Sequence, residues 1–132
     1  MFLSKKSSSE LEMFVRSVSI PAWICFSNGE HIYFNNEYSK YTGLTDKDLR
    51  IKWQNLIHSE DLKLTLDIWN NCLKNGLNYQ RRERIKGKDG QYKWFMTRVF
   101  PIKNDEGKIL KWVGFCTDID EVMEDTKIFK CS

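Results

Sequence analysis

The chain has 132 residues, of which 41% are hydrophobic, 14% are aromatic and 30% are charged, and its formal net charge is +3. This length fits one domain with its own core, and the composition excludes an intrinsically disordered or collagen-like chain. The small net charge gives no reason to expect a nucleic acid as a partner.

The first expected element is a helix over residues 9–20, preceded by a flexible lead-in over residues 1–8. Ser9 and Glu12 have the spacing of a capping box, in which two side chains satisfy free N–H groups at a helix start. Pro21 ends the helix. Its apolar stripe consists of Leu11, Phe14, Val15 and Val18.

The rest of the chain predicts a hairpin, a group of helices and a group of strands. Residues 22–35 favour a hairpin because Asn28-Gly29 tolerates the positive φ angles of a tight turn. The helices are expected over residues 36–41, 45–50 and 59–75. The strands are expected over residues 77–86, 91–102 and 109–119. This order indicates an α+β domain with an antiparallel sheet.

The last two expected strands carry apolar side chains on both faces, which a sheet with one solvated face would not show. We expect the middle helices to cover one face, and the N-terminal helix or a second copy of the chain to cover the other. The candidates for this dimer-forming face are Leu11, Phe14, Val15, Val18, Trp94, Met96, Phe100, Val113 and Phe115.

Four segments resemble the motifs of one family in order and spacing. Residues 53–61 resemble the W..LIHPED segment of PAS domains, and residues 83–94 are similar to their E.R....DG.Y.W hairpin. Residues 28–44 resemble the family's opening pattern, and residues 98–119 its closing pattern. The resemblance extends over nearly the whole chain.

This resemblance implies the PAS fold: a five-stranded antiparallel sheet with helices on one face and a small cavity between them. It implies a PAS core over residues 21–120 and an acidic exit segment over residues 121–132, leading to an output domain. PAS domains with the PAC motif are sensory and protein-interaction modules, mostly cytoplasmic, and often control histidine kinases of two-component systems. A homodimer and a downstream output domain are the expected partners.

The signal exit is expected at Asp118, Ile119 and Asp120. Asp120 stands where the family usually has Thr, and Ser27 replaces an Asp that is common two residues before the hairpin Gly. If those two positions normally interact, the signalling contact differs in this chain.

Three kinds of ligand are considered for the implied cavity. Asn71-Cys72 resembles the dipeptide of flavin-binding light sensors but lacks the Arg and Gln that follow it there. Haem-binding relatives place a His on the long helix, whereas residues 59–75 contain none and His58 lies just before them. No cofactor is therefore predicted, and a small organic molecule competes with a simply filled core. The inward-facing candidates are Ile24, Phe26, Tyr38, Trp53, Ile57, Trp69, Phe95, Thr97 and Cys116.

Other function classes have weak support in the sequence. A small α+β enzyme using His58 and Asp61 is the alternative from a different class, but helix capping explains the acidic residues there. Only two His residues accompany four scattered Cys residues, so no metal site and no catalytic residues are expected. The basic residues between 79 and 98 suit a solvated hairpin rather than a nucleic-acid site. No apolar run is long enough for membrane insertion.

Overall fold

The computed structural model describes residues 5–124, with side chains from residue 10 onward. In this part of the chain, five strands form one antiparallel sheet in the order β2-β1-β5-β4-β3. This arrangement with its helices confirms the expected α+β fold with a five-stranded antiparallel sheet. The elements are α1 (Lys5–Ser17), β1 (Ala22–Phe26), β2 (His31–Phe34), α2 (Asn36–Thr42), α3 (Asp46–Lys52), η1 (Trp53–Leu56), α4 (Ser59–Asn75), β3 (Tyr79–Lys86), β4 (Tyr92–Lys103) and β5 (Ile109–Asp118).

The sheet joins the first hairpin to the last three strands through pairing of β1 with β5. Gly29, with a φ of 92°, closes the first hairpin, as the Asn-Gly pair predicted. Trp23 then pairs with Gly114, and Ile24 with Val113. Strands from the two ends of the chain therefore lie side by side at the centre of the sheet.

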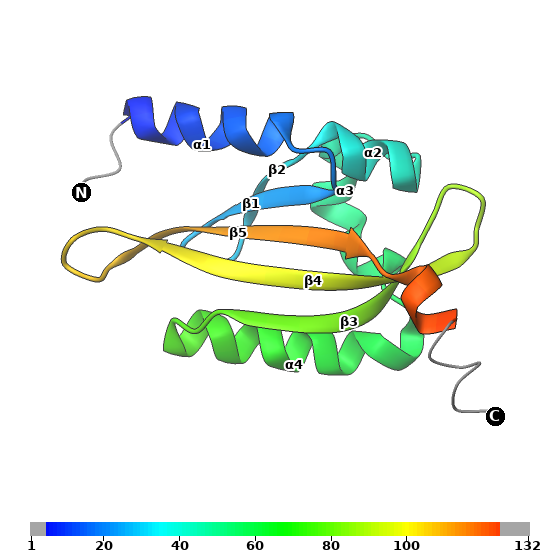
Figure 1. Cartoon of the computed structure of the whole chain (residues 1–132). Coiled ribbons are helices and arrows are strands. Elements are labelled where there is room, and N and C mark those ends of the chain that lie inside the picture. The colour runs from blue at the N-terminus through cyan, green and yellow to red at the C-terminus, as the bar shows by residue number, and fades with distance from the viewer. Residues whose placement is uncertain (1–4, 125–132) are drawn as a thin grey trace.

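The two faces of the sheet are covered by different helices. The inner face, which bears Trp23, Cys25 and Trp112, packs with residues of α2, α3, η1 and α4 in the larger core. The outer face, which bears Ile24 and Val113, packs with α1 in a smaller cluster. Figure 1 shows α1 alongside β1 and α4 alongside β3. Both faces therefore have apolar cover, as the strand pattern predicted.

Asn35 joins elements from both layers. Its buried side-chain oxygen accepts hydrogen bonds from the N–H groups of Ala22, at 3.0 Å, and Tyr38, at 3.1 Å. Its amide nitrogen donates to the carbonyls of Val15 and Ile20, at 3.0 Å and 2.9 Å. One buried side chain thus caps α2 and holds the chain between α1 and β1 in place.

The long helix α4 agrees with the sequence prediction at both ends, whereas α1 ends at Ser17, before the expected residue 20, and also begins earlier than expected. α4 begins at Ser59 as expected, with His58 as its N-cap, and Gly76 ends it with a φ of 66°. α1, however, begins at Lys5, so Ser9 lies inside the helix and the expected capping box is wrong. Residues 120–124 are helical, whereas the remaining residues of the expected exit segment and Cys131 lie outside the described residues.

Candidate functional site

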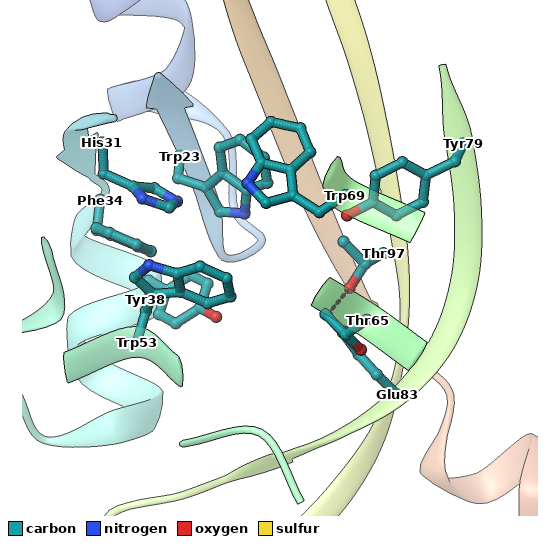
Figure 2. A pocket seen from close by; sticks show the side chains of 10 residues that line it. All are labelled: Trp23, His31, Phe34, Tyr38, Trp53, Thr65, Trp69, Tyr79, Glu83 and Thr97. Carbon is teal, nitrogen blue, oxygen red and sulfur yellow. Dashed lines mark hydrogen bonds between the residues drawn. The ribbon is translucent and has the colours of Figure 1, made fainter. Parts of the chain in front are cut away.

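A cavity lies inside the larger core, between the inner face of the sheet and the helices. Its free space is about 20 Å³, which suffices for one water molecule. Figure 2 shows the side chains around it, with aromatic rings on one side and a hydroxyl-bonded carboxyl group on the other. It is lined by Trp23, His31, Phe34, Tyr38, Trp53, Thr65, Trp69, Tyr79, Glu83 and Thr97.

The aromatic side of the cavity is built from rings that meet mostly edge to face. The Trp23 and Trp69 ring centres are 5.7 Å apart with an angle of 74° between the planes. The rings of Phe34 and Tyr38 are 4.9 Å apart at 73°. Such pairs stabilise a packed core beyond their buried area.

His31 belongs to this aromatic group and not to a polar network. Its ring stacks on Phe34 at 4.8 Å and lies 5.1 Å from the ring of Trp53. Burial lowers the pKa of His31 from 6.5 to about 4, because a charged imidazole is poorly solvated there. His31 is therefore a neutral wall residue at neutral pH.

The polar side of the cavity centres on Glu83, whose side chain is 6% exposed. Its carboxyl oxygens accept hydrogen bonds from the hydroxyls of Thr97, at 2.8 Å, and Thr65, at 2.9 Å. Burial raises the pKa of Glu83, and these two hydrogen bonds together with the charge of Arg81 offset only part of that effect. A titratable group is thus held between α4, β3 and β4.

The structure brings together several residues that the sequence predicted to face inward. Tyr38, Trp53, Trp69 and Thr97 line the cavity. A further group is buried in the surrounding core without lining the cavity: Ile57, Phe95 and Cys116. The role of either group in ligand binding stays a prediction.

Ile24 and Phe26 do not face the cavity, which corrects the sequence prediction. Ile24 packs on the outer face with Val113, and Phe26 is exposed with the Lys111 ammonium 5.1 Å from its ring centre. Trp23 and its alternate neighbour Cys25 face inward instead. Both faces of β1 are covered, so alternation of apolar and polar residues gave no signal for the direction.

Sequence reasoning missed six members of the cavity wall: the ring-bearing residues Trp23, His31, Phe34 and Tyr79, and the polar residues Thr65 and Glu83. Thr65 lies four residues before Trp69 and therefore on the same side of α4. Glu83 has the same strand parity as Ile85, which is buried. These two spacings were the available signals, but polar residues are not expected in a core unless a partner is identified.

The cavity does not fit the cofactors that some PAS domains carry. Space for one water molecule is far too small for a flavin or a haem. Cys72 is buried on α4, and burial raises the pKa of its thiol, which disfavours the nucleophilic thiolate. His58 caps α4 by accepting a hydrogen bond from the N–H of Glu60 at 3.1 Å. These residues therefore have structural roles in this arrangement.

Asp61 is also engaged in structure rather than poised for catalysis. Its carboxylate accepts hydrogen bonds from Arg84 Nη2, at 2.8 Å, Arg84 Nε, at 3.0 Å, and the Arg84 backbone N–H, at 2.9 Å. Although burial raises the pKa of Asp61, the bonds from Arg84 more than offset this and leave the pKa lowered. His58 and Asp61 are the two residues that the enzyme hypothesis required. His58 thus caps α4, and Asp61 forms an ion pair with Arg84.

The exit residues are fastened to the start of β4. The Trp94 N–H donates to Asp120 Oδ1 at 3.1 Å, and the Ile119 N–H donates to the Trp94 carbonyl at 2.9 Å. Asp118 accepts a hydrogen bond from the Asp120 N–H at 2.9 Å. The Arg84 guanidinium lies 4.7 Å from the centre of the Trp94 ring. Arg84 therefore contacts both the start of α4 and the strand that holds the exit.

The expected dimer-face residues fall into two groups. Five pack in the cluster on the chain's own outer sheet face: Leu11, Val15, Val18, Val113 and Phe115. Val15 and Val113 are buried there and are unavailable to a partner. Phe14, on the outer side of α1, is 55% exposed, and Phe100 is 40% exposed. The other two, Trp94 and Met96, are partly exposed.

The described residues contain neither a candidate membrane-spanning helix nor a candidate metal-binding cluster. None of the helices in residues 5–124 is long and apolar enough to cross a bilayer. No three His, Cys, Asp or Glu side chains in the described residues are grouped so that they could hold a metal ion.

Comparison with known proteins identifies sequence relatives over most of the chain. The family model for the PAS fold matches residues 31–116. An uncharacterized protein, y4lL of Sinorhizobium fredii, is 28% identical over 75% of this chain. The peroxide stress-activated histidine kinase mak1 of Schizosaccharomyces pombe is 25% identical over 80% of this chain. The matched segments are only 12% and 6% of those two proteins.

The fold is also similar to that of a solved bacterial sensor. A sensory box histidine kinase/response regulator structure from Burkholderia thailandensis superposes with a TM-score of 0.68. The two sequences are 19% identical, and the match covers 92% of this chain and 93% of that one. This likeness supports the fold.

Proposed function

The chain belongs to the PAS-fold family, and from this premise we propose that it is the sensory module of a longer signalling protein whose output domain is a histidine kinase. Its relatives include such kinases, in which the matching segment is a small part of the protein. We further propose that this module is soluble, that it lies in the cytoplasm and that it acts in a two-component system. The signal would reach the output through the exit residues.

The observation that carries this proposal is the attachment of the exit to β4. Asp120 and Ile119 each form a hydrogen bond with the Trp94 backbone. Trp94 lies under Arg84, which is held by Asp61 at the start of α4. A shift of α4 relative to the sheet would therefore change the contacts that hold the first turn after β5. Two alternative arrangements of the contacts from α4 through Arg84 and Trp94 to the exit residues would give two activity states of the output domain.

A dimer is the second part of the proposal. Phe14 contacts Phe115 edge to face, with ring centres 6.2 Å apart, and still exposes more than half of its surface. Exposed aromatic rings near a sheet face that its own helix covers only in part favour contact with a second copy. Light scattering with and without residues 1–20 tests this point. A full-length chain that stays strictly monomeric contradicts it.

The exit route is tested in a fusion of residues 1–132 to the dimerisation and catalytic parts of a histidine kinase. Asp120→Ala removes the side-chain acceptor for the Trp94 N–H and is expected to change the autophosphorylation rate on the order of fivefold or more. Glu106→Ala, in the exposed β4–β5 turn, is the control and should leave the rate unchanged. Equal rates for both variants and the parent fusion would overturn the proposal.

A ligand-binding sensor is the more specific form of this function, and the cavity favours it. The hydroxyls of Tyr38 and Tyr79 line the cavity, and neither forms a hydrogen bond with another described residue. Native mass spectrometry and an absorption spectrum of freshly purified protein test for a bound molecule. A mass equal to that of the bare chain, with no visible absorption, counts against a tightly retained ligand.

A further inference from the structure

The cavity combines two kinds of chemistry that together select for charge. On one side, the rings of Trp23, Trp53 and Trp69 form part of an aromatic wall. On the other side stands the carboxyl group of Glu83. Aromatic faces attract cations through the ring quadrupole, and a carboxylate attracts them through its charge. An anion would be repelled by the same wall.

The charge of Glu83 is only partly balanced within the protein. Its two hydrogen-bond donors, Thr65 and Thr97, are neutral. Arg81 forms an ion pair with Glu83, but its Nε atom is 3.8 Å from Glu83 Oε2, too far for a hydrogen bond. That Nε atom is buried and has no hydrogen-bond partner among the described residues. A cation inside the cavity would supply the missing compensation.

Two further acceptors stand in the same wall. Tyr38 and Tyr79 line the cavity from α2 and β3, and each phenol oxygen is free to accept a hydrogen bond. Figure 2 shows the Tyr79 hydroxyl turned inward, toward Trp69 and Thr97. A group with several N–H donors would therefore find acceptors on more than one side.

We propose that this cavity binds a small primary alkylammonium ion, whose NH3⁺ group donates hydrogen bonds to Glu83 and to the tyrosine hydroxyls while the tryptophan rings surround it. This inference deepens the proposed sensory function and rests on it. The free space of about 20 Å³ accepts a head group the size of water or ammonium. The alkyl chain is larger than this space, so the proposal requires Trp53, a half-buried residue on the short helix η1, to move when the ion binds.

The choice of a primary amine over other ligands follows from charge and hydrogen-bond donors. A neutral apolar molecule would add nothing to the partial compensation of the Glu83 charge by Arg81, Thr65 and Thr97. A quaternary ammonium ion has no N–H donors for the carboxylate and phenol oxygens. A comparison of ethylammonium with tetramethylammonium therefore tests whether N–H donors are needed. A comparison of ethylammonium with ethanol, a neutral molecule of similar size, tests whether the positive charge is needed.

The test is a titration of the whole chain with ethylammonium chloride, followed by tryptophan fluorescence, because three of the five tryptophans line the cavity. We expect a saturable change that ethanol, sodium chloride and tetramethylammonium chloride do not produce at equal concentration. Glu83→Gln retains groups that bond both threonines and is expected to weaken binding on the order of tenfold or more. Glu106→Gln, at an exposed site, should bind as the parent chain does.

A second variant keeps the test decisive if Glu83→Gln does not fold. Tyr79→Phe removes one acceptor without changing the charge and is expected to weaken binding several-fold, on the order of the loss of one hydrogen bond. Equal responses to ethylammonium and ethanol, or no saturable response to ethylammonium, would overturn the inference. In that case, a kinase fusion whose autophosphorylation rate still changes with Asp120→Ala would continue to support the sensory proposal. Amine binding together with an unresponsive fusion would contradict the sensory proposal and leave the binding site standing.

Discussion

The two faces of the sheet differ in how completely the chain covers them. On the inner face, Trp112 is fully buried and lies edge to face with Trp69, with ring centres 5.3 Å apart. On the outer face, α1 covers Ile24 and Val113 but leaves Phe14 and Phe100 substantially exposed. The inner face thus provides the stability and encloses the cavity. The outer face has apolar surface that the described part of the chain does not cover.

The largest expected difference between the faces is in stability. Trp112→Ala removes a fully buried ring and the hydrogen bond from its Nε1–H to the Ser27 carbonyl, and should lower the free energy of unfolding by about 3–5 kcal/mol. Phe100→Ala, on the outer face, should lower it by less than about 1 kcal/mol, because that ring is already 40% exposed. Urea unfolding measures both. Equal losses would remove the proposed distinction between the two faces.

The inner face should also respond to acid through His31. The unfolded chain binds a proton at His31 near its ordinary pKa of 6.5, and the folded chain only near pH 4. Stability from this group is therefore complete above pH 6.5 and falls as the pH drops toward 4, by about 3 kcal/mol at most. His31→Phe keeps an aromatic ring at the site and should remove this part of the loss. Parallel stability profiles of the two proteins between pH 7 and pH 4 would show that His31 is not buried as described.

A close approach on the inner face gives a third test. Gly114 lies under Trp23, and a Cβ atom there would be 2.2 Å from the Trp23 ring. Gly114→Ala should therefore destabilise the protein by about 1–3 kcal/mol, since the ring must move within a packed core. In a chain that already carries Gly114→Ala, Trp23→Leu should lower the free energy of unfolding by less than it does alone, because it relieves the clash. Strictly additive losses in thermal unfolding would contradict this account.

The smallest effect on monomer stability is expected on the outer side of α1. Phe14→Asp should change the free energy of unfolding by about 0.5 kcal/mol or less, since the side chain is 55% exposed. It should nevertheless shift the proposed dimer to monomer in sedimentation experiments. Ile51→Asp, at an exposed apolar position on α3, is the matched control and should leave association unchanged. A dimer that tolerates Phe14→Asp places the interface elsewhere.

The sequence predicted most of the fold because local signals agreed with the tertiary structure. Asn28-Gly29 predicted the first hairpin, and Ser59 and Gly76 bounded the long helix. The direction of β1 was not predictable, because Ala22–Phe26 is apolar at every position and both of its faces are covered. Alternation identifies a buried face only when the opposite face is polar.

The polar half of the cavity was harder to predict for a different reason. Glu83 was recognised as part of a family motif, but its burial depends on Thr65 and Thr97, which are distant from it in the sequence. A buried carboxyl group is acceptable only when such partners converge, and their convergence is set by the tertiary fold. The aromatic half was predicted only in part: Tyr38, Trp53 and Trp69 were expected to face inward, whereas Trp23, His31, Phe34 and Tyr79 were not identified.

The central claim is that the start of α4 is coupled to the exit through Arg84 and Trp94. Hydrogen–deuterium exchange at the amides of Ile119 and Met123, which are bonded to the Trp94 and Ile119 carbonyls, tests it most directly. Arg84→Met should speed exchange at both amides on the order of fivefold or more, whereas Arg98→Met, an exposed site on the same strand pair, should not. Unchanged exchange at both amides in Arg84→Met would contradict the coupling.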